Sequence, residues 1–203
     1  SDLLPKSALQ CGADACAQST HKIVGAMTQC SMLHVQGQRL DVTRAADVMS
    51  VLTTTSPNYL LMASLDAARA QLQVRGKEMA EDAVMAANKL RAVCSKYAGL
   101  KLLSEADCGG LKLDTTKVTV NFAEWGYTGI EAGDLFRKAG IAVELVDAQN
   151  VLFLVTYADV TSDYETALAK IDTVLKNMEA NKRDRALAPE AQDVPATRSE
   201  ERR

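Results

Sequence analysis

The 203-residue sequence contains no uninterrupted apolar run close to the roughly 18 residues that a membrane span requires. Residues 1–6 lack the order of parts that defines a signal peptide. No clustered basic face is present before the mixed-charge tail, and the formal net charge is −3, which argues against binding to a nucleic-acid backbone. We therefore expect a soluble, cytoplasmic protein that does not bind nucleic acid or membranes.

Metal ligands and disulfide patterns are also scarce. The five cysteines form no CxxC pair, and His21 and His34 are the only histidines. Because a zinc site needs about four ligands at characteristic spacing, we expect no metal. An odd, scattered set of cysteines fits a disulfide framework poorly, so reduced thiols are the better interpretation.

What is present is enough apolar sequence for a real core. Hydrophobic residues make up 47% of the chain and charged residues 24%, which indicates one or two globular domains. Residues 181–203 differ, because they contain Pro189, Pro195 and many charges but almost no large apolar side chains. Such a segment buries too little surface to offset its ordering entropy, so we predict a disordered tail.

The first half of the sequence reads mainly as helix. We predict a strand over residues 31–36 and helices over residues 43–52, 57–74 and 77–97. Ser56 and Pro57 favour a helix start, and Gly76 is expected to separate the two long helices. The last helix has an apolar stripe at spacings of four and three, which indicates a core-facing helix more than a coiled coil: Met79, Ala83, Ala86, Leu90, Val93 and Tyr97.

The second half has a different pattern, with a predicted domain boundary near residues 99–112. Alternation predicts strands over residues 117–122, 142–146 and 151–157. Capping boxes at residues 128–131 and 162–165 predict helices that reach residues 139 and 178. Strand, helix, strand, strand, helix is an α+β layer with its own core.

Lys22 is the residue with the clearest chemical signal. It follows the small residues Ser19 and Thr20 and His21, and it precedes a glycine-containing segment. A lysine on a short connection between sheet elements is suited to attack an aldehyde, because partial desolvation favours the neutral amine. The structural alternative is a solvated surface lysine, which the four residues alone favour.

Longer stretches of sequence carry a family resemblance. Residues 29–35 and 53–66 follow the lysine, and residues 117–120, 126–131 and 147–152 form a second block in the same order and at similar spacing. Over residues 8–178 the chain resembles the pyridoxal-phosphate-dependent ornithine/lysine/arginine decarboxylases. The resemblance implies an α/β protein with a partial aminotransferase-like large domain over residues 1–105, with an incomplete sheet and long helices. It also implies an α+β small domain over residues 106–180, followed by the disordered tail over residues 181–203.

The resemblance also implies roles for four residues. Lys22 would form the internal aldimine with pyridoxal 5'-phosphate, and Ser19 and His21 would contact the cofactor phosphate as donors. Thr54, with Thr53 and Thr55 open as alternatives in register, would reach a phosphate across a homodimer interface. Five other residues are possible functional residues, but ordinary turn, packing or capping roles explain them equally well or better: His34, Trp125, Glu131, Asp147 and Asn150.

Several family features are missing from these 203 residues. Members have, upstream of the lysine, an aspartate for the pyridine nitrogen, a histidine that stacks on the ring and a phosphate loop. We therefore expect a fragment, or one chain of a split enzyme whose partner supplies the N-terminal half of the cofactor domain. The expected reaction is decarboxylation of lysine, arginine or ornithine, and the sequence does not choose among them. The alternatives are a non-catalytic truncated homologue that acts as a dimerisation module, or another reaction on the same fold such as transamination.

Overall fold

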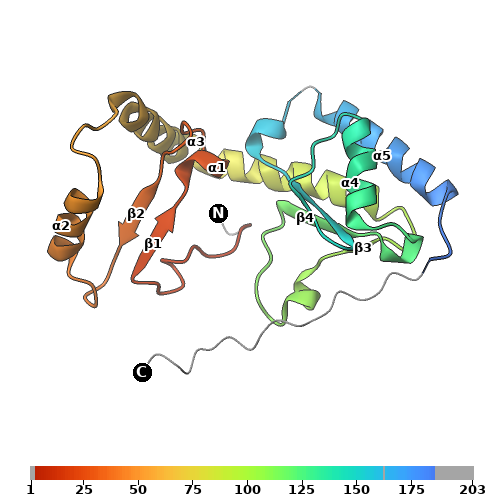
Figure 1. Ribbon diagram of the computed structural model, residues 1–203, viewed down its shortest axis with the longest axis horizontal. Helices are drawn as coiled ribbons and strands as arrows, with labels where there is room; N and C mark the ends of the chain where they lie inside the picture. Colours follow the sequence, from red (N-terminus) through yellow and green to blue (C-terminus); the bar gives the residue numbers. More distant parts are fainter. Residues whose placement is uncertain (1–2, 162, 186–203) are drawn as a thin grey trace.

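The computed structural model describes residues 3–161 and 163–185, which form two units joined by one long helix (Figure 1). The first unit contains a two-stranded antiparallel sheet, β1 (Ala15–Gln18) and β2 (Met32–Val35), in which Cys16 pairs with His34. The short helix α1 (Thr20–Ile23) lies in the connection between these strands, and α2 (Val42–Leu52) follows β2. The strand predicted over residues 31–36 and the helix predicted over residues 43–52 are confirmed.

Helix α3 (Tyr59–Cys94) joins the two units, and here the predicted break at Gly76 is wrong. Gly76 lies inside a continuous helix, and burial of the residues that follow it, such as Met79 and Leu90, helps to offset the cost of about 1 kcal/mol that glycine brings to a helix interior. The predicted N-cap is also shifted. The Asn58 side chain, not that of Ser56, accepts hydrogen bonds from the Leu60 and Leu61 amides.

The second unit is a four-stranded antiparallel sheet with helices on one face. Its strand order is β3-β4-β6-β5. The elements are β3 (Lys101–Leu102), β4 (Lys117–Asn121), α4 (Gly129–Lys138), β5 (Leu145–Val146), β6 (Asn150–Leu154) and α5 (Tyr164–Ala180), with 3-10 turns η1 (Glu105–Cys108), η2 (Ala123–Trp125) and η3 (Tyr157–Asp159). The predicted order of strands and helices is confirmed, and the two-residue strand β3 was not predicted.

The core of the second unit includes the C-terminal half of α3. Val118 and Val120 on β4 and Val151 and Phe153 on β6 alternate inward, as period-two strands with one packed face do. The apolar stripe predicted on α3 joins them, since Ala86 and Leu90 belong to the same buried cluster. The predicted core-facing helix is therefore confirmed, and the domain boundary at residues 99–112 stays a prediction.

Local signals explain several positions in this unit. Thr128 and Glu131 form the predicted capping box at the start of α4. Trp125 is fully buried, and its indole N–H donates to the Ala98 carbonyl. Asp147 accepts hydrogen bonds from the Gln149 and Asn150 amides in the turn before β6. Structural roles for these residues are thus confirmed.

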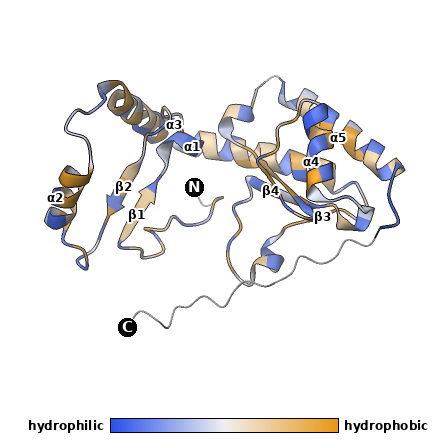
Figure 2. Cartoon of the chain, viewed as in Figure 1, coloured by the Kyte–Doolittle hydropathy of each residue, from blue (hydrophilic) through white to orange (hydrophobic). Residues whose placement is uncertain are grey.

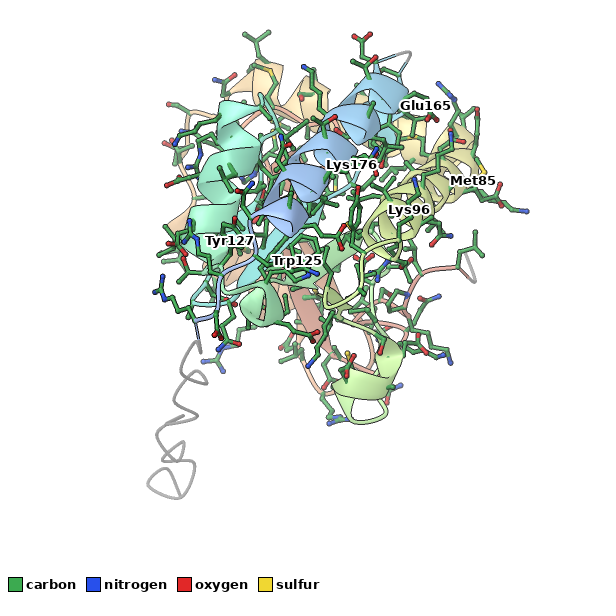
Figure 3. The ribbon with its side chains drawn as sticks, turned by 90° about the vertical axis from the view of Figure 1, so that its right-hand side faces the viewer. Met85, Lys96, Trp125, Tyr127, Glu165 and Lys176 are labelled. Carbon is green, nitrogen blue, oxygen red and sulfur yellow. The ribbon has the colours of Figure 1, made fainter. Side chains whose placement is uncertain are left out.

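The C-terminal end of α5 leads into a segment that packs on this unit. Residues 181–185, called the C-terminal strap below, follow α5 and run beside Trp125 and Tyr127, which Figure 3 shows near one another at the end of α5. The Arg183 amide donates to the Trp125 carbonyl at 3.0 Å, and the Tyr127 hydroxyl donates to the Asn181 carbonyl at 2.9 Å. The disorder predicted from residue 181 is therefore wrong for these five residues, and residues 186–203 lie outside the described part of the chain. Ser162, from the second predicted capping box, lies outside it too; α5 begins at Tyr164 with Asp163 as N-cap.

The first unit leaves much apolar surface exposed. Helix α2 has no buried residue, and Figure 2 shows apolar residues along α2 and the start of α3. The exposed side chains are Val42, Val48, Met49, Val51 and Leu52 on α2 and Tyr59, Leu60 and Met62 on α3. Patches of this kind mark contact surfaces in soluble proteins. Within the described residues, no helix is long and apolar enough to cross a membrane.

Candidate functional site

Lys22 lies in α1, directly after β1. Its amide donates to the Ser19 carbonyl at 3.1 Å, and the helix ends where Val24 turns to an extended backbone. The Lys22 side chain is exposed, and no carboxylate of residues 3–161 or 163–185 lies within ion-pair distance of it. The lysine is therefore held on a short connection between strands, as predicted, but the rest of the described chain does not desolvate its amine.

His21 is anchored by one main-chain oxygen. Its amide donates to the Cys30 carbonyl at 3.2 Å, and its Nδ1 lies 2.8 Å from the same oxygen. Because a carbonyl only accepts, Nδ1 must carry the proton and donate. Nε2 is then the ring atom left for a ligand, and it can donate to an anion only when the imidazole is protonated.

Helix α3 fixes the loop that follows the lysine. Cys30 is buried, and its thiol donates to the Leu61 carbonyl at 3.4 Å. The Met27 amide donates to the Ser64 hydroxyl at 2.7 Å. Sequence reasoning missed these anchors, and the available signal was a serine within an otherwise apolar first stretch of α3. The turn with Lys22 is thus braced by residues about 30 to 40 positions later in the chain.

The structure brings three of the four predicted site residues together. Ser19 is the N-cap of α1, and its hydroxyl makes no capping hydrogen bond, so it is available to a ligand beside His21 and Lys22. Thr54 lies in the connection between α2 and α3, which Figure 1 places away from α1. The Thr54 hydroxyl accepts from the Ser56 amide at 3.1 Å. Within one chain, Thr54 is therefore separate from the lysine turn.

A cavity of about 480 Å³ lies behind the lysine turn. Ile23 and Val24 line it from α1 and the residue that follows, Leu72 and Met79 from α3, and Tyr157 from η3. It thus lies where the two units meet, next to the residues that directly follow Lys22.

Asp114 is the one carboxylate among the described residues lining this cavity. Burial pushes its pKa up, but hydrogen bonds from Lys117 and Thr116 outweigh that effect and hold the pKa below its usual range. The carboxylate is therefore ionised and already engaged within the second unit.

Comparison with known proteins identifies the class. Residues 3–117, more than half of the chain, match the family described as Orn/Lys/Arg decarboxylase, major domain. The chain belongs to this family. An arginine decarboxylase from Bacillus anthracis is 37% identical over 183 residues, which cover 87% of this chain and 37% of that protein. The chain thus spans well under half the length of this curated relative.

Solved structures agree on the fold. Lysine decarboxylase A from Pseudomonas aeruginosa superposes with a TM-score of 0.64 at 22% identity, over 82% of this chain and 29% of that one. A NifS-like protein from Rickettsia africae superposes with a TM-score of 0.62 at 12% identity, over 85% of this chain and 50% of that one. The predicted α/β class, a partial aminotransferase-like large domain followed by an α+β domain, is thereby confirmed.

Proposed function

We propose that this chain contributes the cofactor lysine and small domain to pyridoxal-phosphate-dependent decarboxylation of a basic amino acid. Membership of the Orn/Lys/Arg decarboxylase family and similarity to proteins named arginine and lysine decarboxylase support this reaction class. The observation that carries the proposal is Lys22 on a braced turn inside the segment that matches the family. Arginine, lysine and ornithine are the candidate substrates.

The residues present fit the cofactor. The phosphate of the cofactor is a dianion, and one four-residue turn offers it the Nε2 of His21 and the Ser19 hydroxyl, which makes no capping hydrogen bond. The same turn presents the amine of Lys22. Pyridoxal phosphate, when bound, supplies an aldehyde that condenses with amines and a ring that accepts the electron pair left by a departing carboxylate. Lys22 would hold the cofactor covalently, and Ser19 and His21 would orient it through its phosphate.

His21 would contact the phosphate through one of its two ring nitrogens. With Nδ1 donating to the Cys30 carbonyl, Nε2 donates to the phosphate only from the imidazolium form. The Cys30 carbonyl, which accepts from Nδ1, would hold the ring so that Nε2 is left for the phosphate. The Lys22 Nζ, when it is not bonded to the cofactor, would be able to hold or return a proton beside it.

The apolar surface of the first unit supports a protein partner. Helix α2 buries no residue, although it presents Val48, Met49, Val51 and Leu52. We propose that a second copy of this chain, or a chain that supplies the N-terminal half of the cofactor domain, covers this surface. In a homodimer, Thr54 beside this surface would reach the phosphate bound by the other copy.

All five cysteines are free thiols, and a reducing compartment suits them. We propose the cytoplasm as the site of the reaction.

The same apolar surface favours a second candidate function, a non-catalytic module that pairs with an intact relative. The two functions differ in whether Lys22 is used. A module needs α2 and the start of α3 but not the lysine, whereas an enzyme needs both.

The test uses this chain co-expressed with a chain supplying the segments that precede the lysine in the relatives, a preparation called the reconstituted pair below. We expect the pair to bind pyridoxal phosphate with visible absorption and to release carbon dioxide from arginine, lysine or ornithine. Lys22→Ala should abolish both, and Lys6→Ala, which removes another exposed lysine, should leave both unchanged. Unaltered absorption in the Lys22→Ala pair would overturn the assignment.

A further inference from the structure

The loop that follows Lys22 contains a strained turn. The Cys30 amide donates to the Met27 carbonyl at 3.1 Å, which closes a four-residue turn with Gln29 at its third position. Gln29 has a φ of +79°, and in the described part of the chain it is the one residue other than glycine with a positive φ. Glycine is the usual residue where the third position of a turn has a positive φ. Because the Gln29 side chain is exposed, contacts of the neighbouring residues must hold its backbone in this conformation.

Both ends of this turn are bonded to the start of α3. The Met27 amide donates to the Ser64 hydroxyl at 2.7 Å, and the Cys30 thiol donates to the Leu61 carbonyl at 3.4 Å. Cys30 is buried, so packing also holds its end of the turn. The Met27 side chain is 53% exposed, so its end of the turn relies on the hydrogen bond to Ser64.

The same turn determines where α1 lies. Helix α1 has four residues and buries none of them, and a helix of this length is not stable by itself. The Cys30 carbonyl accepts from the His21 amide at 3.2 Å and from the His21 Nδ1 at 2.8 Å. Lys22 directly follows His21. A shift of the turn therefore moves the carbonyl to which the helix with the lysine is bonded.

We infer that Ser64 is a positioning residue for Lys22. Its hydroxyl holds the strained turn of residues 27–30 on α3, and the Cys30 carbonyl at the end of that turn holds α1. This inference rests on the proposed function and adds to it a link from α3 to the cofactor lysine. Ser64 does not touch the reacting atoms. It acts by keeping the turn in a backbone conformation that Gln29 does not favour.

The first experiment needs no cofactor and uses the 203-residue chain. Ser64→Ala removes one oxygen and adds no bulk, so the Met27 amide loses its acceptor. The informative amides are those of His21 and Cys30, because both keep their own acceptors in this variant. Hydrogen exchange at these two amides should accelerate about fivefold, the factor that one hydrogen bond is worth, while global unfolding changes little.

Two further variants separate positioning from general damage. Ser50→Ala is the matched control, because the Ser50 hydroxyl donates to the Ala46 carbonyl within α2, and it should leave both exchange rates unchanged. Gln29→Gly relieves the strained backbone, since glycine adopts a positive φ without steric cost. Combined with Ser64→Ala, it should return both rates close to those of Gln29→Gly alone. Unchanged rates in Ser64→Ala, equal acceleration by Ser50→Ala, or no recovery in the double variant would overturn the inference.

The second experiment uses the reconstituted pair. Ser64→Ala should lower kcat about fivefold with KM nearly unchanged, because misplacement of a reacting group by a fraction of an ångström costs rate more than binding. Gln29→Gly in the same chain should restore most of kcat. A wild-type pair without cofactor attached to Lys22 would overturn the proposed function, while the exchange data would still decide whether Ser64 holds the lysine turn. An active pair in which Ser64→Ala retains full kcat would overturn the positioning role alone.

Discussion

The C-terminal strap allows a prediction with a built-in control. Gly126 has a φ of +72°, and a methyl carbon on it would lie 2.4 Å from the Arg183 carbonyl oxygen. Gly140 has nearly the same φ of +77°, but its methyl would meet only the end of the Lys170 side chain at 4.0 Å. Alanine at either site therefore strains the backbone equally, and only Gly126→Ala forces the strap from its place.

The magnitudes follow from the contacts. The left-handed backbone costs an alanine roughly 1–2 kcal/mol, which is the whole effect expected at Gly140. Displacing the strap also removes the hydrogen bond from the Arg183 amide to Trp125, worth about 1 kcal/mol. The ion pair of Arg183 with Glu131 and the stacking of Arg183 on Tyr127 add about 0.5 kcal/mol each at their partly exposed positions. We expect Gly126→Ala to be about 2 kcal/mol more destabilising than Gly140→Ala.

Two measurements on the 203-residue chain check this. Urea unfolding can follow the fluorescence of Trp125, the single tryptophan. Limited trypsin digestion reports the strap itself, because Lys182, Arg183 and Arg185 become cleavable when it is released. Equal unfolding midpoints and equal cleavage in the Gly126→Ala and Gly140→Ala proteins would refute the strap as a stabilising contact.

Three further predictions concern stability. Backbone hydrogen bonding from Thr128 is the main cause that lowers the pKa of Glu131 to about 2. The stability that this carboxylate contributes is therefore present above its unfolded pKa and lost as the pH falls toward 2. The difference in urea midpoint between wild type and Glu131→Gln should shrink from about pH 6 to about pH 2.5, and a constant difference would contradict this role of Glu131. Arg91 donates to three main-chain carbonyls, so Arg91→Met should lower the free energy of unfolding by about 2–4 kcal/mol and an unchanged value would show the contacts to be unimportant. Asn58→Ala should cost about 1 kcal/mol in the same assay and Ser56→Ala nearly nothing, and the reverse order would mean that Ser56 caps α3.

Features set by neighbouring residues were predictable from the sequence. The capping box of Thr128 and Glu131 joins residues three apart, and α4 starts where it predicts. The alternation of residues 117–122 likewise identifies β4 and its buried face, because a strand with one packed side has period two. Lys22, Ser19 and His21 were selected through a resemblance to the family that the match over residues 3–117 supports, and their roles stay predictions.

Features set by distant contacts were not predictable. Gly76 was predicted to end a helix, yet α3 continues through it, and most of the residues that α3 buries follow Gly76 and pack toward the second unit. The bonds that brace the lysine loop join Met27 to Ser64 and Cys30 to Leu61, and no local pattern announces pairs this far apart in sequence. The C-terminal strap was not predictable for the same reason. Its charged residues are typical of a disordered tail, and its contacts with Trp125 and Glu131 join positions far apart in the sequence.

The central claim is that Lys22 is the residue that holds pyridoxal phosphate. The reconstituted pair is incubated with pyridoxal phosphate and treated with borohydride, which converts a cofactor-bound lysine to a stable secondary amine, and the attached group is located by peptide mass spectrometry. The account predicts one modified peptide, which contains Lys22. The modified peptide should disappear when an excess of a primary amine, which competes with Lys22 for the cofactor aldehyde, is added before reduction. Modification spread over several lysines, or confined to a lysine other than Lys22, would contradict it.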